Sequence, residues 1–394
     1  MRRIYLDNAA TSFPKPPGVA EAVLDYLTNV GASAGRGAYR EAVESGRLLD
    51  SCRTEIRALA RAAPDDAVIF TLNGTDALNL AIKGCVNPGQ HVVTTSMDHN
   101  SVLRPLTTLE ERQGVSWTAV QPDPQTTLIN PAAIERAMTP QTALVAINHA
   151  SNVTGALQPI ARISDICRRR GVPLLVDAAQ SMGHVPSACF DAPMDLLAFP
   201  GHKGLLGPLG TGVLVIRAAM VERLRSLREG GTGSLSEQPR QPQHAPDKFE
   251  AGSHNAVGLA GLLAALRWIH TESVAALAQR ESALAARMLN GLERLQRENR
   301  AVHYFGPRDP DCRVAVFSVL IDGLEPAELS ALLETHYGLL TRSGLHCAPL
   351  AHRTIGTDSR GGTCRLSFGA MNTTEDVDAA LAALSEIAAG ASVQ

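Results

Sequence analysis

The chain has 394 residues, of which 45% are hydrophobic and 19% are charged, and its formal net charge at pH 7 is −3. This length is enough for two domains, and the near-neutral charge, without any basic cluster interleaved with aromatic residues, argues against nucleic acid as a partner. No apolar run is long enough to span a membrane and the first residues lack the apolar core of a secretory signal, so we expect a cytoplasmic protein.

The first segment, YLDNAATSFPKPP, has little periodicity and several turn-forming residues. Residues 1–16 are therefore predicted to form an extended arm, and a helix is expected from Pro17 to Val30. Gly35, Arg36 and Gly37 then predict a flexible turn before an amphipathic helix that runs to about Ala63.

The stretch VIFTLNGTDALNLAIK is typical of a strand, a turn and a helix. The backbone N–H groups of Gly74 and Thr75, the Thr75 hydroxyl and the positive end of the helix dipole together suit a phosphate group. The same three-residue turn is equally good as an ordinary helix cap, so the pattern by itself leaves both interpretations open. Two more strands are predicted, at HVVTT and at Ala143 to Ile147. His99 lies in the loop after the first of them.

Asn152 comes just after the second of these strands, at the carboxyl end where ligands gather in doubly wound sheets. Next, Leu174 to Val176 reads as a buried strand of a parallel sheet, and Asp177 follows it at once. A carboxylate in that position is costly unless a cation neutralises it. A second apolar run, Leu196 to Phe199, leads to Lys203 at the lip of a neighbouring strand.

Asp177 and Lys203 make chemical sense together as a pyridoxal phosphate site. The lysine would hold the cofactor as a Schiff base, the acid would keep the ring nitrogen protonated, and Gln180 would donate to the phenolic oxygen. The alternative is a pair of solvated charges at the rim of an ordinary sheet. His202, directly before the lysine, is within reach of the phosphate.

The polar stretch from Gly230 to Gly252 predicts a long loop. After Gly258 the chain changes character: two helices rich in alanine and leucine, Ala256 to His270 and Ser273 to Asn299, precede the strands RVAVFSVLI and TCRLSF. Helices from Glu325 to about Tyr337 and from Thr374 complete this part. The pattern predicts a smaller α+β domain.

Cys347 lies in the loop LLTRSGLHCAPLAHRTIG, next to His346 and near Arg342. Neighbouring donor or cationic groups lower the pKa of a thiol, which makes this cysteine a candidate nucleophile. The seven cysteines contain no CxxC pair, so neither a disulfide framework nor a metal site is expected. Arg365 and Arg342 carry the permanently charged, planar fork that suits a substrate carboxylate.

VDAAQ and FPGHKGLLGPLGTGVLVI resemble the core of the class V aminotransferases, and within them the cysteine desulfurases. RSGxHCA is similar to the desulfurase subgroup with a short, ordered catalytic loop. The resemblance spans nearly the whole chain and implies an α/β, fold-type I pyridoxal phosphate enzyme that is a homodimer. It implies a mainly parallel seven-stranded sheet in a large domain (17–257), a small α+β domain with the cysteine loop (258–394), and an arm (1–16) on the small domain or at the active-site mouth.

The resemblance also assigns roles to individual residues. His99 would stack on the cofactor ring, Asn152 would lie near its phenolic oxygen and the substrate, and Ser253 would reach the partner's phosphate across the dimer interface. The expected catalytic residues are Lys203, Cys347 and His99. The expected cofactor-binding residues are Gly74, Thr75, His99, Asn152, Asp177, Gln180, His202, Lys203 and Ser253, and the expected substrate-binding residues are Asn152, Arg342 and Arg365.

The implied reaction converts L-cysteine to L-alanine and leaves a persulfide on Cys347 for a sulfur acceptor, such as a scaffold for iron–sulfur clusters, a carrier protein or a small thiol. Tyr39 stands where similar sequences have a histidine, and Pro200 where many have a phosphate-binding serine. Selenocysteine lyase, cysteine sulfinate desulfinase, another β-eliminase, a class V aminotransferase and a non-catalytic sulfur-trafficking scaffold remain alternatives.

Overall fold

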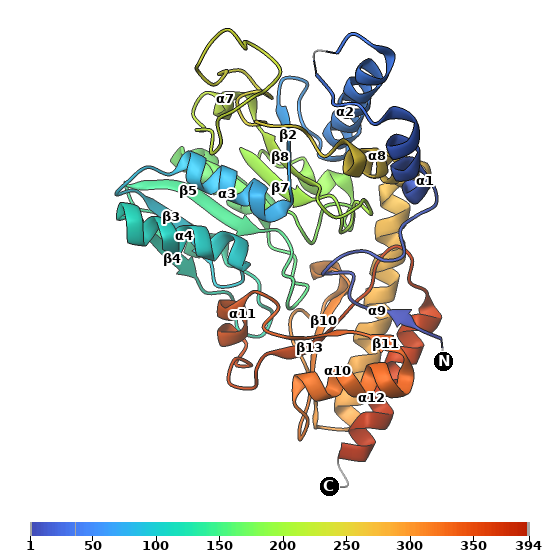
Figure 1. Cartoon of the computed structure of the whole chain (residues 1–394). Coiled ribbons are helices and arrows are strands. Elements are labelled where there is room, and N and C mark those ends of the chain that lie inside the picture. The colour runs from blue at the N-terminus through green and yellow to red at the C-terminus, as the bar shows by residue number, and fades with distance from the viewer. Residues whose placement is uncertain (1, 36, 392–394) are drawn as a thin grey trace.

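The computed structural model describes residues 2–35 and 37–391, so Arg36 of the predicted turn lies outside the described residues. Within that range the chain forms a seven-stranded sheet, a four-stranded sheet and a two-stranded pair. Figure 1 shows the large sheet in one half of the molecule and the small sheet in the other, with the long helix α9 (Val274–Glu298) running alongside both.

The large sheet has the strand order β2-β8-β7-β6-β5-β3-β4. All neighbouring strands run parallel except at β8, which is antiparallel to both β2 and β7. This confirms the predicted α/β fold with a mainly parallel seven-stranded sheet. The strands are β2 (Ala67–Thr71), β3 (His91–Thr95), β4 (Ser116–Val120), β5 (Thr142–Asn148), β6 (Leu174–Asp177), β7 (Leu196–Pro200) and β8 (Gly212–Ile216).

Helices cover both faces of this sheet, which is why its central strands are apolar at nearly every position. Alternate side chains of each strand enter two separate cores. One core is closed by α3 (Gly74–Cys85) and α4 (Asn100–Gln113), which lie on the same face in Figure 1. The other is closed by α2 (Arg40–Leu59), α5 (Pro131–Ala137), α6 (Ile160–Arg170) and α8 (Ala256–Glu272).

The small sheet is antiparallel, in the order β12-β13-β10-β9, and has its own core. Its elements are β9 (Val302–Tyr304), β10 (Val316–Ile321), β12 (Arg342–Gly344), β13 (Thr363–Ser367), α10 (Pro326–Tyr337) and α12 (Thr374–Ala391). The short helices α7 (Ala218–Val221) and α11 (Pro349–Thr354) lie in loops. No helix or strand forms between Gly230 and Gly252, as the sequence predicted.

The amino-terminal arm joins the two halves. Its strand β1 (Ile4–Tyr5) pairs in parallel with β11 (Leu339–Leu340) of the small half, and the next residues contact the large half. The expected helix at its end is divided into α1 (Val19–Asp25) and a π-helical turn, η1 (Tyr26–Val30). The Tyr26 hydroxyl stabilises this wider turn by hydrogen bonds with the Ala32 carbonyl and the Ser45 hydroxyl.

Helix α8 bears on the division of the chain into domains. It packs against α1 and α2 and contributes to the core of the large sheet, whereas α9 packs against α12. A boundary at residue 257 would separate α8 from the residues that bury it. We therefore propose that the large domain extends to about Ser273, where α8 gives way to α9.

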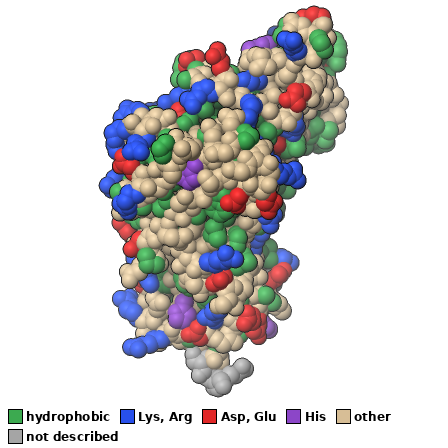
Figure 2. Space-filling model, turned by 90° about the vertical axis from the view of Figure 1, so that its left-hand side faces the viewer, with side chains coloured by type: hydrophobic (Ala, Val, Ile, Leu, Met, Phe, Trp, Pro, Cys, Tyr) green, Lys and Arg blue, Asp and Glu red, His purple; other side chains and the backbone are tan. Residues whose placement is uncertain are grey.

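The molecular surface has no strongly basic face in the view of Figure 2, where side chains of both signs are interspersed. None of the helices in the described part of the chain is both long and apolar enough to cross a bilayer.

Candidate active site

A cavity opens at the carboxyl ends of β5, β6 and β7, between these strands and the first turns of α3 and α4. The sheet brings together residues that are far apart in the sequence, because parallel strands end at the same edge. The lining includes Gly74, Thr75, His99, Asn152, Asp177, Gln180, His202 and Lys203, which are eight of the nine residues predicted to bind the cofactor.

Asp177 ends β6 and is buried, with 5% of its surface exposed. Its carboxylate accepts one hydrogen bond, 2.9 Å long, from the Ala179 amide. Burial raises the pKa of Asp177, against the lowering effects of that amide and of Lys203. A buried acid with so few partners favours a cationic or N–H donor placed in the cavity.

Lys203 lies in the turn after β7, at the same edge of the sheet. Burial lowers the pKa of its amine to about 8, opposed by the attraction of Asp177 and reinforced by the repulsion of Arg365. An amine with such a pKa is partly neutral at physiological pH, and a neutral amine is the form that attacks a carbonyl group.

Two glycines let the Lys203 turn approach the loop after Asp177. A Cβ atom on Gly204 would lie 2.2 Å from the Met182 carbonyl oxygen, and one on Gly183, at φ +85°, would lie 2.2 Å from the Gly204 carbonyl oxygen. Any side chain at these positions would push the two backbones apart. Close backbone packing therefore fixes the distance between the lysine and the acid.

The other end of the cavity suits an anion. The amides of Gly74 and Thr75 lie at the positive end of α3, whose amino-terminal cap is formed by Asn73 accepting from the Asp76 amide at 2.9 Å. A Cβ on Gly74 would lie 3.2 Å from Pro200. Beside them, Nδ1 of His202 is buried and has no hydrogen-bond partner in the described part of the chain. Such an unsatisfied nitrogen fits a ligand phosphate better than an apolar core.

His99 caps α4 and faces the same cavity. Its Nδ1 accepts the Ser101 amide at 3.0 Å, which places the ring proton on Nε2. Burial, together with the nearby positive charges led by Lys203, lowers the pKa of His99 to about 4. The ring is therefore neutral at pH 7, and its Nε2–H is free to donate to a ligand. Its Nδ1 also lies 2.8 Å from the Ser101 hydroxyl, and that hydroxyl contacts the Thr75 hydroxyl.

Cys347 lies in the small half of the chain and, like Arg342 and Arg365, is not among the residues that line the cavity. Its loop adjoins the cavity at Asn100, the residue after His99. His346 and Cys347 both adopt left-handed backbone conformations, with φ of 47° and 57°, which is unusual for two consecutive residues with side chains. The main chain is held there because the Cys347 carbonyl accepts from the Asn100 amide at 2.8 Å. The thiol residue itself is exposed and follows directly on this anchor.

His346 does not supply the cation that its place beside Cys347 suggested. Its ring is buried, its Nε2 lies 3.1 Å from the Thr363 hydroxyl, and burial lowers its pKa to about 2. The His352 ring lies 5.4 Å away, with its own pKa lowered to about 4 by burial. The two rings are packing groups, and no cluster suited to a metal ion occurs in residues 2–35 and 37–391.

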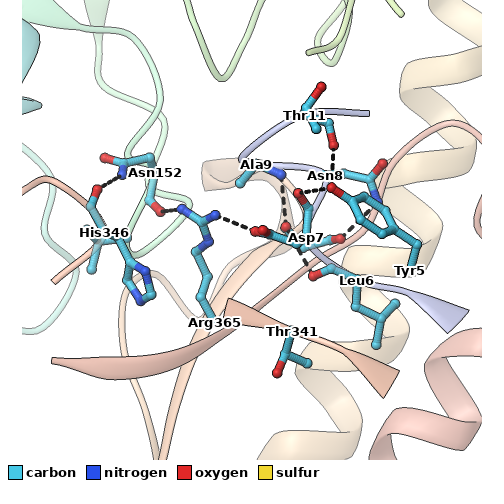
Figure 3. Close-up of polar contacts among 12 residues, drawn as sticks. Tyr5, Leu6, Asp7, Asn8, Ala9, Thr11, Asn152, Thr341, His346 and Arg365 are labelled. Atoms are coloured by element: carbon cyan, nitrogen blue, oxygen red, sulfur yellow. Dashed lines mark hydrogen bonds and ion pairs between the residues drawn. The ribbon is translucent and has the colours of Figure 1, made fainter. Parts of the chain in front are cut away.

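The side-chain amides of Asn152 and Gln180 make contacts that the sequence did not predict. Asn152 donates to the His346 carbonyl at 2.7 Å, so it holds the cysteine loop in place (Figure 3). Gln180 donates to the Ala9 carbonyl at 2.8 Å and holds the arm. Both residues still line the cavity, and one hydrogen bond from each links it to the cysteine loop or to the amino-terminal arm.

Arg365 lies on β13 and is almost fully buried. Its guanidinium donates to Asp7 at 2.6 Å and to the Asn152 carbonyl at 3.1 Å, on opposite sides of the group in Figure 3. Arg342 is directly opposite Arg365 in the antiparallel register of β12 and β13, so both side chains leave the same face of the sheet. Two cations on one face of a sheet repel each other, and the Asp7 carboxylate already offsets part of the charge at Arg365.

Ser253 is the one predicted cofactor residue that lies away from the cavity. It is exposed and lines a second pocket, together with Gly210 and Asn255. Its loop is anchored by Glu250, which accepts from Arg53 in a two-pronged ion pair, from His254, and from the Phe70 amide. These contacts anchor the Ser253 loop to α2 and β2 at the molecular surface.

Replacing Glu250 with glutamine should lower the free energy of unfolding by about 3 kcal/mol, because Arg53 would become a partly buried charge without an anion. The matched control is Asp378→Asn, which also removes the acid of a two-pronged arginine pair, but one that is about half exposed. Urea denaturation of both variants at one protein concentration measures the difference. Equal midpoints for the two variants would contradict the anchoring role of Glu250.

Several residues of the site escaped prediction. Asp7, which pairs with Arg365, and Ser101 and Asn148, which line the cavity, were not singled out. The asparagine at the end of β5 could have been found by the same reasoning that found Asp177 at the end of β6, because both follow buried strands. No local sequence pattern connects Asp7 with Arg365, which is 358 positions away.

Comparisons with known proteins agree with this geometry. The family model "Aminotransferase class-V" matches residues 4–380. A probable cysteine desulfurase of Methanothermobacter thermautotrophicus is 33% identical, covering 98% of this chain and 94% of the relative, and one of Pyrococcus abyssi is 31% identical with the same coverage. The apo structure of a cysteine desulfurase from Thermococcus onnurineus superimposes with a TM-score of 0.90 at 31% identity, covering 98% of this chain and 95% of that one.

Proposed function

The chain belongs to the cysteine desulfurase branch of the class V aminotransferase family, and on that premise we propose that it removes sulfur from L-cysteine, leaving L-alanine and a persulfide on Cys347. The observation that carries the proposal is the seating of Cys347. Its backbone is fixed to the start of α4, next to His99, in a strained conformation that a passive loop would not need.

The cavity fits pyridoxal 5'-phosphate, the cofactor of this family. Asp177 is a buried acid with room for an N–H donor, and His202 has an unsatisfied nitrogen beside the anion end formed by Gly74 and Thr75. When bound, the cofactor supplies an electron sink for bonds at the substrate α-carbon. Lys203 would hold it, Asp177 would face its ring nitrogen, His99 would lie on its ring, and Asn152 and Gln180 would border it.

Arg365 and Arg342 would bind the substrate carboxylate. A carboxylate between the two guanidinium groups would relieve their repulsion across β12 and β13, and Arg365 is preset by its contacts on both sides. Asn152 would orient this end of the substrate, since it already joins Arg365 to the Cys347 loop. The same three residues would therefore place the substrate sulfur on the side of the thiol.

The protein groups move protons and sulfur. Once its amine is free, Lys203 would accept the proton of the substrate α-carbon at Nζ and later donate one back to the carbon fragment. The Cys347 thiolate would attack the substrate sulfur, so that an S–S bond forms while the C–S bond breaks and its electron pair stays with the carbon fragment. Protonation of that fragment gives L-alanine, and the persulfide stays on Cys347.

The proposal includes a homodimer in which Ser253 of each chain contributes to its partner's phosphate site. The exposed position of Ser253 on an anchored loop supports this. A sulfur acceptor would then collect the persulfide, since Cys347 is exposed. We further propose that the enzyme acts in the cytoplasm, as a transferase supplying sulfur for processes such as iron–sulfur cluster biogenesis.

The purified protein supplied with L-cysteine and a reducing thiol should release alanine and sulfide in equal amounts. Parallel assays with L-selenocysteine, L-cysteine sulfinate, and L-alanine plus an oxoacid separate desulfuration from selenocysteine lyase, desulfinase and aminotransferase activity. The proposal requires a persulfide at Cys347, detected by mass spectrometry of the peptide. Amino-group transfer to the oxoacid as the dominant reaction would refute it.

A further inference from the structure

Asp7 is the anion that balances Arg365. Arg365 is 1% exposed, and in the described part of the chain its one carboxylate partner is Asp7, at 2.6 Å. The remaining contact is a neutral carbonyl, that of Asn152. Taking a charge out of water without an opposite charge is costly, so Asp7 accounts for the stability of a buried arginine at this place.

The arm holds Asp7 firmly. The Tyr5 hydroxyl donates to the carbonyls of Asp7 and Thr11, and the Ala9 amide donates to the Ser367 hydroxyl on β13 (Figure 3). Beyond Asp7, the side-chain hydroxyl of Thr11 donates to the His202 carbonyl, next to Lys203. These contacts fix the backbone of the arm around Asp7, whose side chain is 19% exposed and pairs with Arg365.

Resting on the proposed function, in which Arg365 receives the substrate carboxylate, we propose that Asp7 is the resident counter-ion of Arg365 and sets the affinity of the site for amino-acid carboxylates. Arg365 has five N–H donors, and its contacts with Asp7 and Asn152 leave N–H groups for a ligand. A ligand carboxylate thus shares one guanidinium with Asp7 and is repelled by it at short range.

The consequence follows from linkage between the two anions. Asp7 weakens the binding of the ligand carboxylate to Arg365, and the ligand carboxylate weakens the ion pair of Asp7 with Arg365 by the same free energy. Asp7 therefore stabilises the ligand-free enzyme while it weakens the binding of substrate and product, which favours release of L-alanine after each turnover. An amine without a carboxylate is not subject to this repulsion.

The test compares two ligands that differ by one carboxylate, L-alanine and ethylamine, on the cofactor-loaded protein. Calorimetric titration should show that Asp7→Asn binds L-alanine about tenfold more tightly than the wild type, a coupling typical of interacting sites. Ethylamine should bind both proteins equally. The matched control is Glu334→Gln, which removes the acid of the exposed ion pair made by Arg3 of the same arm and should leave both affinities unchanged.

A second variant covers the case in which Asp7→Asn does not fold. Tyr5→Phe keeps every charge but removes the hydrogen bonds to the backbone carbonyls of Asp7 and Thr11, so the arm that positions Asp7 is held less firmly. This variant should tighten L-alanine binding about twofold, with no change for ethylamine. Weaker or unchanged L-alanine binding in the variant measured, or equal shifts for both ligands, overturns the proposal. If the wild type binds L-alanine but releases none from L-cysteine, the desulfurase function fails instead, and the affinity ratio still decides the role of Asp7.

Discussion

Replacement of Cys347 by alanine is expected to abolish the release of sulfide from L-cysteine, by about three orders of magnitude or more, while the fold and the bound cofactor stay unchanged. The thiol is the nucleophile of the proposed sulfur transfer, and it lies on an exposed loop that is anchored through the backbone, so its removal leaves the anchors in place. Sulfide and alanine released in the presence of a reducing thiol are the measured quantities.

Cys189→Ala is the matched control, because Cys189 is also exposed but lies in the short helix at Ser187–Phe190 and borders a different pocket. This variant should retain full activity. Reactions that need no persulfide, such as release of sulfite from L-cysteine sulfinate, should also survive in Cys347→Ala. Desulfuration of L-cysteine that persists at the wild-type rate in Cys347→Ala would exclude the proposed role of the thiol.

Replacement of Lys203 by alanine should have a comparably large effect on turnover and should in addition remove the covalent attachment of the cofactor. Both follow from one amine, since Nζ of Lys203 would hold the cofactor and carry the proton, and proton transfer alone contributes about 10²- to 10⁴-fold. Borohydride reduction followed by peptide mapping should place the cofactor on Lys203 in the wild type. A label on any other lysine would refute the assignment.

The pH dependence of cofactor attachment supplies an independent check on Lys203. Its pKa of about 8 means that the reactive neutral amine predominates above pH 8 and falls about tenfold for each unit below it. The rate of absorbance change on adding pyridoxal phosphate to cofactor-free protein should therefore decline from pH 8 to pH 6. A decline centred near the ordinary lysine pKa of 10.5 would contradict the influence of burial. Lys203→Arg, which keeps the charge, should show no such attachment at any pH.

The sequence predicted which residues lie at the carboxyl-terminal edge of the large sheet. Asp177, His99 and Lys203 each follow a buried strand, and the strands are short, apolar and separated by turns, so their carboxyl ends could be expected to meet. The turn at Gly74 and Thr75 could be recognised as a helix start, but the pattern left a phosphate site and an ordinary helix cap equally possible. These features depend on residues close together in the sequence, and a single sequence allows predictions mainly from such neighbours.

Contacts between the two halves of the molecule could not be predicted from the sequence. The Asn152 amide holds the His346 carbonyl, 194 residues further on, and the buried His346 ring is neutral despite its place beside Cys347. Composition places α8 at the start of the small domain, and its packing against α1 and α2 is the basis for the longer large domain that we propose. The sequence of an apolar helix face predicts that the face will be buried, but it does not predict which other element will pack against it.

The amino-acid sequence by itself determined which segments become strands and helices, and hence which polar residues end up at strand ends and helix starts, because hydrophobic periodicity and turn residues act over a few positions. The tertiary structure alone decided that Asp7 faces Arg365 and that Cys347 is fastened beside His99. Those pairings depend on how two separately formed cores dock, and the charge and backbone conformation of each residue are settled only once its distant neighbours have excluded water.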